Sequence, residues 1–260
     1  GLTFMDFVIN VAPVIPLIMF ATFLPLKFIY GNKMQVSEED KKRIMAFRED
    51  EAITDSKLLK QCLFVLGIVI LGFFFHGLLR LESATIALFG AALLLLITNI
   101  EVHEVFGRVE WVTIFFFIGL FVVVAGLKET GVIKLMAEKM IQITKGDISN
   151  TALLILWVSA VASAIVDNIP FVATMIPMIK EMGATMGGAD KILPLWWALS
   201  LGACLGGNGT IIGASANVIV AGFSERAGYP IKFFRFMLLA FPLMLISIII
   251  STVYLILFHL

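Results

Sequence analysis

The sequence has little charge and few cysteines for a chain of its length. Charged residues make up 15% of the 260 positions, and 19 basic residues balance 19 acidic ones. A net charge of zero gives no reason to expect a nucleic-acid partner. The two cysteines, Cys62 and Cys204, lie far apart in apolar surroundings, so they form neither a CxxC metal pattern nor a disulfide framework. We therefore expect no metal site.

Long apolar runs are abundant instead. Hydrophobic residues occupy 60% of the positions, a share typical of membrane proteins and not of soluble domains. We expect an all-α polytopic membrane protein, because a helix satisfies its own backbone hydrogen bonds in hydrocarbon. The transmembrane segments predicted on this basis are residues 7–30, 61–79, 83–99, 112–127 and 233–260.

Two further segments are defined by where their charges lie. Residues 31–60 form the one long hydrophilic stretch, and between Lys27 and Lys60 there are eight Lys/Arg and seven Asp/Glu. By the positive-inside rule this loop is predicted to be cytoplasmic, in a protein of the plasma (inner) membrane. Residues 128–145 carry apolar side chains at helical spacing and charges on another face, which predicts a helix lying in the membrane interface.

Asp167, Asn168 and Pro170 interrupt the apolar run of residues 151–180, in SAIVDNIPFVATMIP. A carboxylate at the bilayer centre costs about 3 kcal/mol on insertion scales, so it must face protein or a water-filled cavity. Pro170 removes a backbone donor and disfavours helical geometry at Ile169. We predict a re-entrant hairpin whose polar tip reaches mid-membrane. The alternative is a single kinked transmembrane helix.

Five glycines interrupt the next apolar run, residues 195–223, in GACLGGNGTIIGASANVIV. Each glycine weakens a helix by about 1 kcal/mol relative to alanine, which predicts a broken helix. Unwinding frees backbone carbonyls beside neutral side-chain oxygens, and this suits a hard cation or an oxyanion. The alternative is close glycine-mediated helix packing in lipid. The predicted hinge residues of the two breaks are Pro170, Gly206, Gly207 and Gly213.

The pair VDNIPFVATMIP and GNGTIIGASANVIVAGFSERAGY resembles the C-terminal half of the ion transporter superfamily, in its arsenite permease, P-protein and citrate-transporter-like branch. The resemblance implies a second inverted repeat with a re-entrant hairpin and a broken transmembrane helix, within a homodimer. It also implies a missing N-terminal repeat upstream of Gly1. The residues that match the family's ion and substrate site are Asp167, Asn168, Thr174, Asn208, Gly209, Thr210, Ser215 and Asn217.

A secondary active transporter explains both breaks and the mid-membrane aspartate together. The resemblance implies arsenite or antimonite efflux or sodium/proton antiport, with sodium- or proton-coupled citrate or dicarboxylate transport as the alternative. A non-transporting membrane subunit is a further alternative. An intramembrane hydrolase would need a nucleophile with its base, and neither Asp167 nor Ser163 has an evident partner. The expected partners are membrane lipid and a small inorganic or organic ion, with Na+ or H+ as coupling ion and no other cofactor.

Asp167 has two alternative roles. It is the only acidic residue predicted to lie deep in the membrane, so a proton and a cation would compete for its carboxylate and couple transport to an ion gradient. Alternatively, the side chain only caps the helix that starts at Ile169, a role that asparagine fills nearly as well.

Overall fold

Helices account for all the regular structure in the described part of the chain. The computed structural model describes residues 2–31, 37–46, 48, 53–98 and 100–260, and these contain α- and 3-10 helices but no strand. The all-helical fold expected from the sequence is confirmed. Within these described ranges, five helical segments are long and apolar enough to cross a bilayer, as a polytopic membrane protein requires. They are Phe4–Tyr30, Ser56–Leu79, Trp111–Glu129, Ile148–Ile165 and Phe233–Phe258.

The chain forms two compact units, which are described separately. Unit 1 comprises residues 1–9 and 26–111, and unit 2 comprises residues 10–25 and 112–260. The predicted cytoplasmic loop belongs to unit 1 and contains a short helix, α3 (Glu38–Met45). Residues 32–36, 47 and 49–52 of this loop lie outside the described residues, so the loop's side of the membrane stays a prediction.

In unit 1, α5 (Ser56–Leu79) and α6 (Ser83–Ile97) pack together as a hairpin. The turn between them begins at Arg80, which has a left-handed φ of 54°. Close packing depends on Gly72, where a Cβ atom would lie 2.7 Å from Cγ2 of Ile86. With 15 residues at about 1.5 Å each, α6 is about 22 Å long, less than the roughly 30 Å hydrocarbon core. A crossing at residues 83–99 therefore stays a prediction.

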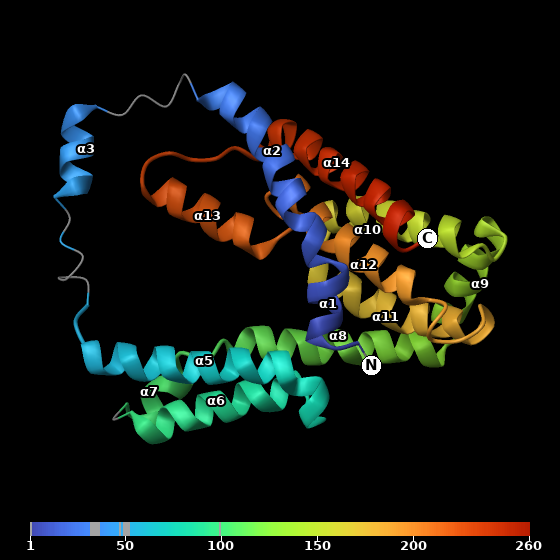
Figure 1. Cartoon of the computed structure of the whole chain (residues 1–260), viewed down its shortest axis with the longest axis horizontal. Coiled ribbons are helices and arrows are strands. Elements are labelled where there is room, and N and C mark those ends of the chain that lie inside the picture. The colour runs from blue at the N-terminus through green and yellow to red at the C-terminus, as the bar shows by residue number, and fades with distance from the viewer. Residues whose placement is uncertain (1, 32–36, 47, 49–52, 99) are drawn as a thin grey trace. The chain divides into compact units, whose positions relative to one another are not determined.

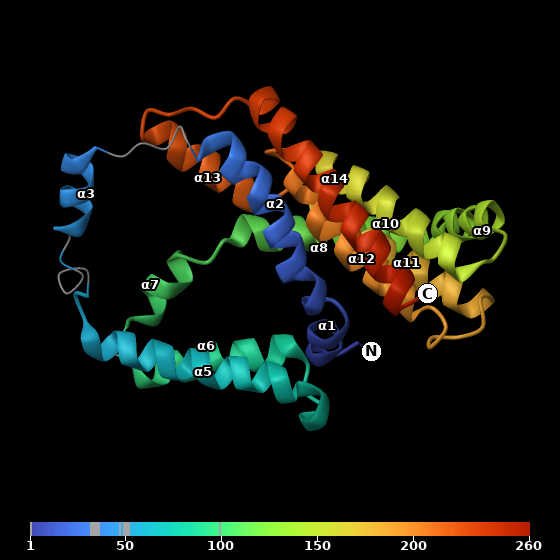
Figure 2. The same ribbon diagram turned by 45° about the horizontal axis from the view of Figure 1, so that its top comes forward.

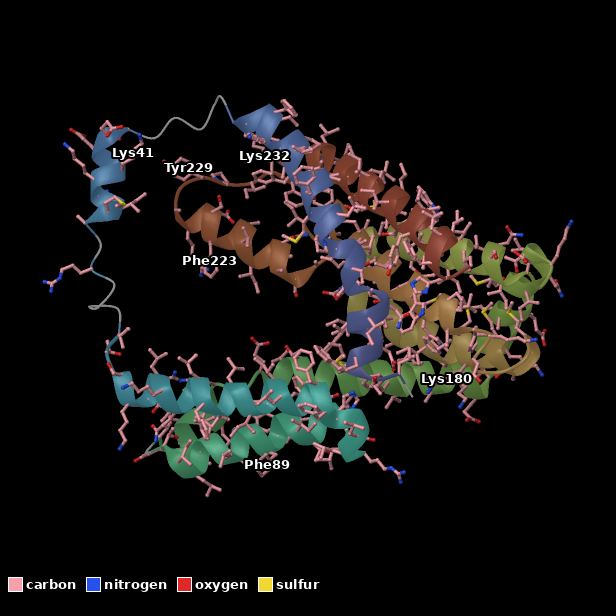
Figure 3. The ribbon with its side chains drawn as sticks, in the orientation of Figure 1. Lys41, Phe89, Lys180, Phe223, Tyr229 and Lys232 are labelled. Carbon is pink, nitrogen blue, oxygen red and sulfur yellow. The ribbon has the colours of Figure 1, made fainter. Side chains whose placement is uncertain are left out.

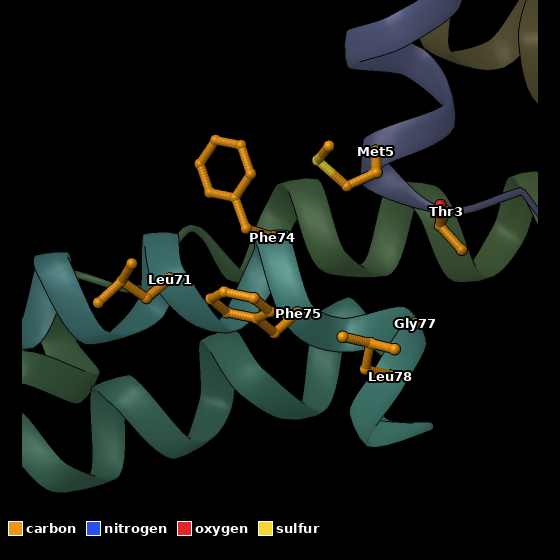
Figure 4. A pocket seen from close by; sticks show the side chains of 7 residues that line it. All are labelled: Thr3, Met5, Leu71, Phe74, Phe75, Gly77 and Leu78. Atoms are coloured by element: carbon orange, nitrogen blue, oxygen red, sulfur yellow. The ribbon is translucent and has the colours of Figure 1, made fainter.

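A pocket of about 550 Å³ lies between α1 (Phe4–Asn10) and α5 in unit 1 (Figure 4). Its only polar side chain, Thr3, already donates its hydroxyl to Oδ2 of Asp6 at 2.8 Å. A site for a polar ligand needs several convergent polar groups. The pocket is therefore suited to hydrocarbon rather than to an ion. Its lining residues are Thr3, Met5, Leu71, Phe74, Phe75, Gly77 and Leu78.

The core of unit 2 is built around α12 (Leu193–Gly206). This helix packs most extensively against α10 (Ile148–Ile165) and also contacts α11 (Asn168–Thr185) and α14 (Phe233–Phe258). Both ribbon views show these helices side by side (Figures 1 and 2). The residues buried between them are mostly large and aliphatic, including Ile155, Leu156, Leu195, Leu201, Ile248 and Leu255.

The helices α8 (Trp111–Glu129) and α9 (Val132–Thr144) come directly before this core in the chain. The first, α8, ends two residues beyond the predicted span. The second, α9, is the predicted interfacial helix, and it packs against α11 and α10. A buried hydrogen bond fixes its end, because Oγ1 of Thr151 donates to Oγ1 of Thr144 at 2.7 Å. The position of α9 relative to the bilayer stays a prediction.

The first span, residues 7–30, is interrupted at one of its prolines but not at another. Between α1 and α2 (Ile15–Tyr30) lies a 3-10 turn that contains Pro13, whereas Pro25 lies inside α2 without ending it. The interruption leaves the carbonyl of Asn10 to other donors. It accepts the hydroxyl of Tyr254 at 3.0 Å and lies 3.2 Å from Nε2 of His259. The two ends of unit 2 are thereby clasped together.

Candidate functional site

The first predicted break separates α10 from α11. Val166 has extended backbone, and Asp167 is the N-cap of α11, with its Oδ1 accepting a hydrogen bond from the Ile169 amide at 3.1 Å. Pro170 lies in the first turn of α11, where backbone N–H groups have no acceptor within the helix. Pro170 therefore starts α11 rather than kinking a continuous helix. The break is real, and its cap is the aspartate.

A re-entrant hairpin whose tip reaches mid-membrane implies two helices of half the membrane's thickness, and both helices of this break are longer than that. Each has 18 residues, about 27 Å at about 1.5 Å per residue. In α11, however, Lys180 and Glu181 limit the apolar part to residues 168–179, about 18 Å. This apolar length is too short for a full crossing of a roughly 30 Å core. The re-entrant placement of residues 151–180 stays a prediction.

The second predicted break separates α12 from α13 (Ser215–Arg226). α12 ends at Gly206, a 3-10 turn covers Gly207–Gly209, and residues 210–214 are not helical. Tight backbone contacts make glycine necessary here. A Cβ on Gly213 would lie 2.6 Å from the Gly207 carbonyl oxygen and 2.8 Å from that of Ser163. The broken segment thus lies directly against the end of α10.

Other glycines of this segment mediate close helix packing, which was the alternative interpretation of the sequence. A Cβ on Gly206 would lie 2.5 Å from Cα of Ala160, and a Cβ on Gly202 would lie 2.8 Å from Cβ of Ser159. These two glycines, four residues apart, allow α10 and α12 to approach closely. The two interpretations therefore apply to different glycines, since Gly202 and Gly206 serve packing and Gly207 and Gly213 form the break.

Thr210 and Asn217 hold the second break in shape. The hydroxyl of Thr210 donates to the Ala164 carbonyl at 2.5 Å and accepts from the Gly213 amide at 3.1 Å. Nδ2 of Asn217 donates to the carbonyls of Gly207, at 3.2 Å, and Thr210, at 3.0 Å. Ala164 lies three residues before Asp167, so these bonds also bring the two breaks together. Thr210 and Asn217 thus satisfy the backbone that unwinding frees.

The remaining predicted site residues differ in their burial and in whether their side chains already make hydrogen bonds. Thr174 is half-buried and donates back to the Phe171 carbonyl of its own helix at 2.7 Å. Gly209 is buried, with Met244 and Ala164 around it. Among the predicted site residues, all of which the structure describes, the side chains of half-buried Asn168 and of exposed Asn208 and Ser215 make no hydrogen bond. These three, with the second oxygen of Asp167, are available to a ligand.

Two serines of α10 also contribute, although neither was among the predicted site residues. Ser163 is fully buried and donates to the Ala203 carbonyl of α12 at 2.7 Å, which fixes the height of α12 beside the first break. Ser159 is fully buried as well, and its Oγ has no partner among the described residues. The sequence signal was their spacing, since Ser159 and Ser163 are four residues apart and share a face of the helix with Ala160 and Ala164.

Replacing Thr210 with valine should destabilise unit 2 by about 1–3 kcal/mol. Valine has the same shape but loses both hydrogen bonds and leaves the buried Gly213 amide without its partner. Thermal or denaturant unfolding in detergent would measure the change. Thr22→Val is the matched control, because that hydroxyl bonds only to carbonyls of its own helix. Equal stability of the two variants would contradict a locking role for Thr210.

The arrangement of two adjoining helix breaks can be compared with known proteins. Residues 1–202, which include the first break, match the model of the family CitMHS, described as citrate transporter. The chain belongs to the CitMHS family. This agrees with the resemblance found in the sequence motifs, and the apolar helices agree with an integral membrane protein.

Relatives of this CitMHS chain extend the match through the second break. An uncharacterized transporter of Mycobacterium tuberculosis is 42% identical over 255 residues, which cover 98% of this chain and 59% of the relative. The P protein of Homo sapiens is 40% identical over 237 residues, which cover 86% of this chain and 28% of that protein. The chain thus spans about three fifths of the length of the mycobacterial relative. No solved structure matches the present chain.

Proposed function

We propose that the chain is the C-terminal half of a secondary active ion transporter, with ion and substrate held where the two helix breaks adjoin. The observation that carries the proposal is the division of labour among the polar residues. Thr210 and Asn217 lock the broken backbone, whereas Asn168, Asn208 and Ser215 make no hydrogen bond within the described residues. Uncommitted amides and hydroxyls beside freed carbonyls are the donor set that transporters place at broken helices.

The coupling ion in this proposal is Na+ or H+. One carboxylate, on Asp167, and several neutral oxygens form a donor set that suits a hard monovalent cation. No group of three or more His, Cys, Asp or Glu residues that could hold a metal ion occurs in the described ranges. A proton and Na+ would compete for the Asp167 carboxylate, and occupancy would bias movement of α11 and α13 about the breaks. The hinges of that movement are Pro170, Gly207 and Gly213.

The substrate is a small ion, and two classes are favoured by different observations. The family description and the neutral donors favour a citrate- or dicarboxylate-like anion. The absence of arginine from SAIVDNIPFVATMIP and GACLGGNGTIIGASANVIV instead favours arsenite or antimonite efflux or sodium/proton antiport, because multiply charged carboxylates are usually bound through arginine. All of these use the same site, so the transported ion is decided by flux measurements.

The proposal includes a missing N-terminal repeat, a homodimer and the plasma membrane. The missing repeat is supported by the exposure of α13, the second half of the broken helix, because none of its residues is buried. A helix that lines a transport site must be covered on that side by protein. The inverted partner repeat would supply the cover, and the chain length of the mycobacterial relative leaves room for one.

The test is ion flux in vesicles that contain this chain joined to the expected N-terminal repeat. Citrate, arsenite and sodium are offered in turn, under a proton or sodium gradient, with the chain alone as the control. We expect gradient-driven flux of one substrate with the joined protein and none with the chain alone. Flux from the chain alone would reject the half-site, and no flux of any ion would favour a non-transporting subunit.

A further inference from the structure

The connection between α13 and α14 concentrates basic and aromatic side chains. Arg226 ends α13, Lys232 is the N-cap of α14, and Arg235 lies in the first turn of α14. We call these three residues the basic cluster. Glu225 is the only acidic residue among residues 224–260. The cluster therefore carries an excess of positive charge that its own segment does not neutralise.

The three cations have no ionic partner in the described structure. The ion pairs Lys41–Glu38 and Arg108–Glu104 both lie in unit 1, and no ion pair of the basic cluster is found among the described residues. The side chains of Arg226, Lys232 and Arg235 are exposed. Arg226 makes one directed contact, with its guanidinium carbon 4.8 Å above the ring centre of Phe223. The charges are therefore available to an external anion.

Large aromatic side chains accompany the basic cluster. Phe223, Tyr229 and Phe234 are 60%, 76% and 70% exposed, so each is far from a protein core. Two of them and Lys232 are labelled along this connection in Figure 3. Exposed aromatic rings beside Lys and Arg are typical of the zone between the hydrocarbon core and the headgroups. The rings would lie at the level of the acyl chains' upper ends, and the cations at the level of the phosphates.

The connection has a defined shape rather than being a loose linker. The amide of Tyr229 donates to the Ser224 carbonyl at 2.8 Å, and the hydroxyl of Ser224 donates to the Tyr229 carbonyl at 2.5 Å. Gly228 allows this closure because its φ is 88°. The closed turn holds Arg226 and Tyr229 in place before the chain enters α14, which is long and apolar enough to span a bilayer. The cluster therefore sits within about one helical turn of a membrane-spanning segment.

We propose that the basic cluster binds the headgroup of an anionic phospholipid. The guanidinium groups of Arg226 and Arg235 can each form two hydrogen bonds to phosphate oxygens, and Lys232 adds a point charge. A lipid is favoured over an acidic protein segment because the aromatic rings and the adjoining span place the cations at headgroup depth. The inference concerns lipid recognition, so it does not depend on which ion is transported.

The test uses the whole chain in phosphatidylcholine vesicles with spin-labelled phosphatidylglycerol or phosphatidylcholine as the probe. The variant is Arg226→Gln with Lys232→Gln and Arg235→Gln. The matched control is Lys134→Gln with Lys139→Gln and Lys145→Gln, which removes the same charge from exposed positions of α9 and its end. Retention of helix content and monodispersity shows that both variants fold.

We expect the unmodified chain and the α9 control to immobilise phosphatidylglycerol in preference to phosphatidylcholine. Removing one basic residue weakens binding to an anionic surface about fivefold. The cluster variant lacks three, so it should lose at least about fivefold of this preference. An unchanged preference in the cluster variant, or an equal loss in the control, would overturn the proposal. Two further results would also overturn it: displacement of the lipid by inorganic phosphate at matched ionic strength, and capture of polyglutamate without any lipid preference. The first would assign the cluster to free anions, and the second to an acidic protein segment.

Discussion

Replacing Gly206 with alanine should force α10 and α12 apart and destabilise unit 2 by about 1–3 kcal/mol or more. The new Cβ would overlap the carbonyl oxygen of Ala160 and lie 2.5 Å from its Cα. These are backbone atoms, so no side-chain rotation relieves the clash. Because Gly206 is the last residue of α12, the shift would also displace Asn208 and Thr210. Unfolding in detergent measures the stability loss, and flux of the joined protein measures the effect on the site.

Two further variants make the Gly206 result specific. Gly119→Ala introduces the same methyl group into α8, where nothing lies within 4 Å, so it should leave stability unchanged or raise it by up to about 1 kcal/mol. Adding Ala160→Gly to Gly206→Ala should not restore stability, because the clash is with the Ala160 backbone. Full rescue by Ala160→Gly would show that the methyl group of Ala160, and not the backbone contact, sets the helix distance.

Asp167→Asn should abolish ion-coupled transport in the joined protein while leaving stability nearly unchanged. The carboxylate is the only group at the adjoining breaks that can exchange a proton for a cation. Asparagine keeps the cap of α11, since it accepts from the Ile169 amide about as well as aspartate does. Asp167→Ala should also abolish transport but cost about 1 kcal/mol in addition, because the cap is lost. Flux as a function of pH and unfolding in detergent separate the two effects.

Asp147 provides the matched control for this substitution. It caps α10 in the same way, by accepting from the Asn150 amide at 2.8 Å, and it lies outside the candidate site. Asp147→Asn should therefore leave both stability and flux unchanged. If Asp167→Asn kept the unmodified rate and pH profile, Asp167 would be a helix cap only and the coupling hypothesis would fail.

The positions of the helix breaks follow from the sequence because their causes are local. Asp167 caps a helix through an amide two residues away, and Pro170 acts within its own turn, so both effects are readable from neighbouring residues. The glycines between Gly206 and Gly213 likewise lower helix propensity at their own positions. The extent of the helices is harder to predict, since α10 and α11 gain length from packing against α12, α14 and α9. This is why both exceed the expected half-length.

The partners within the candidate site could not be predicted because they lie far apart in sequence. The Thr210 hydroxyl reaches the Ala164 carbonyl across 46 residues, and the Ser163 hydroxyl reaches the Ala203 carbonyl across 40. Nothing in either segment specifies the register in which α10 and α12 meet. The sequence identifies Thr210, Asn208 and Asn217 as polar residues of one break. It does not show that Thr210 and Asn217 bond to the backbone whereas Asn208 makes no hydrogen bond.

The clasp on the Asn10 carbonyl sets an order of events during synthesis. Tyr254 and His259 follow Asn10 by 244 and 249 residues, so at about 5–20 residues per second they leave the ribosome about 12–50 s later. The segment of residues 10–25 must therefore wait in the membrane while every other helix of unit 2 is made. Its contact with the end of α14 cannot form before Tyr254 and His259 have been made, and a chain truncated before them would lack this contact.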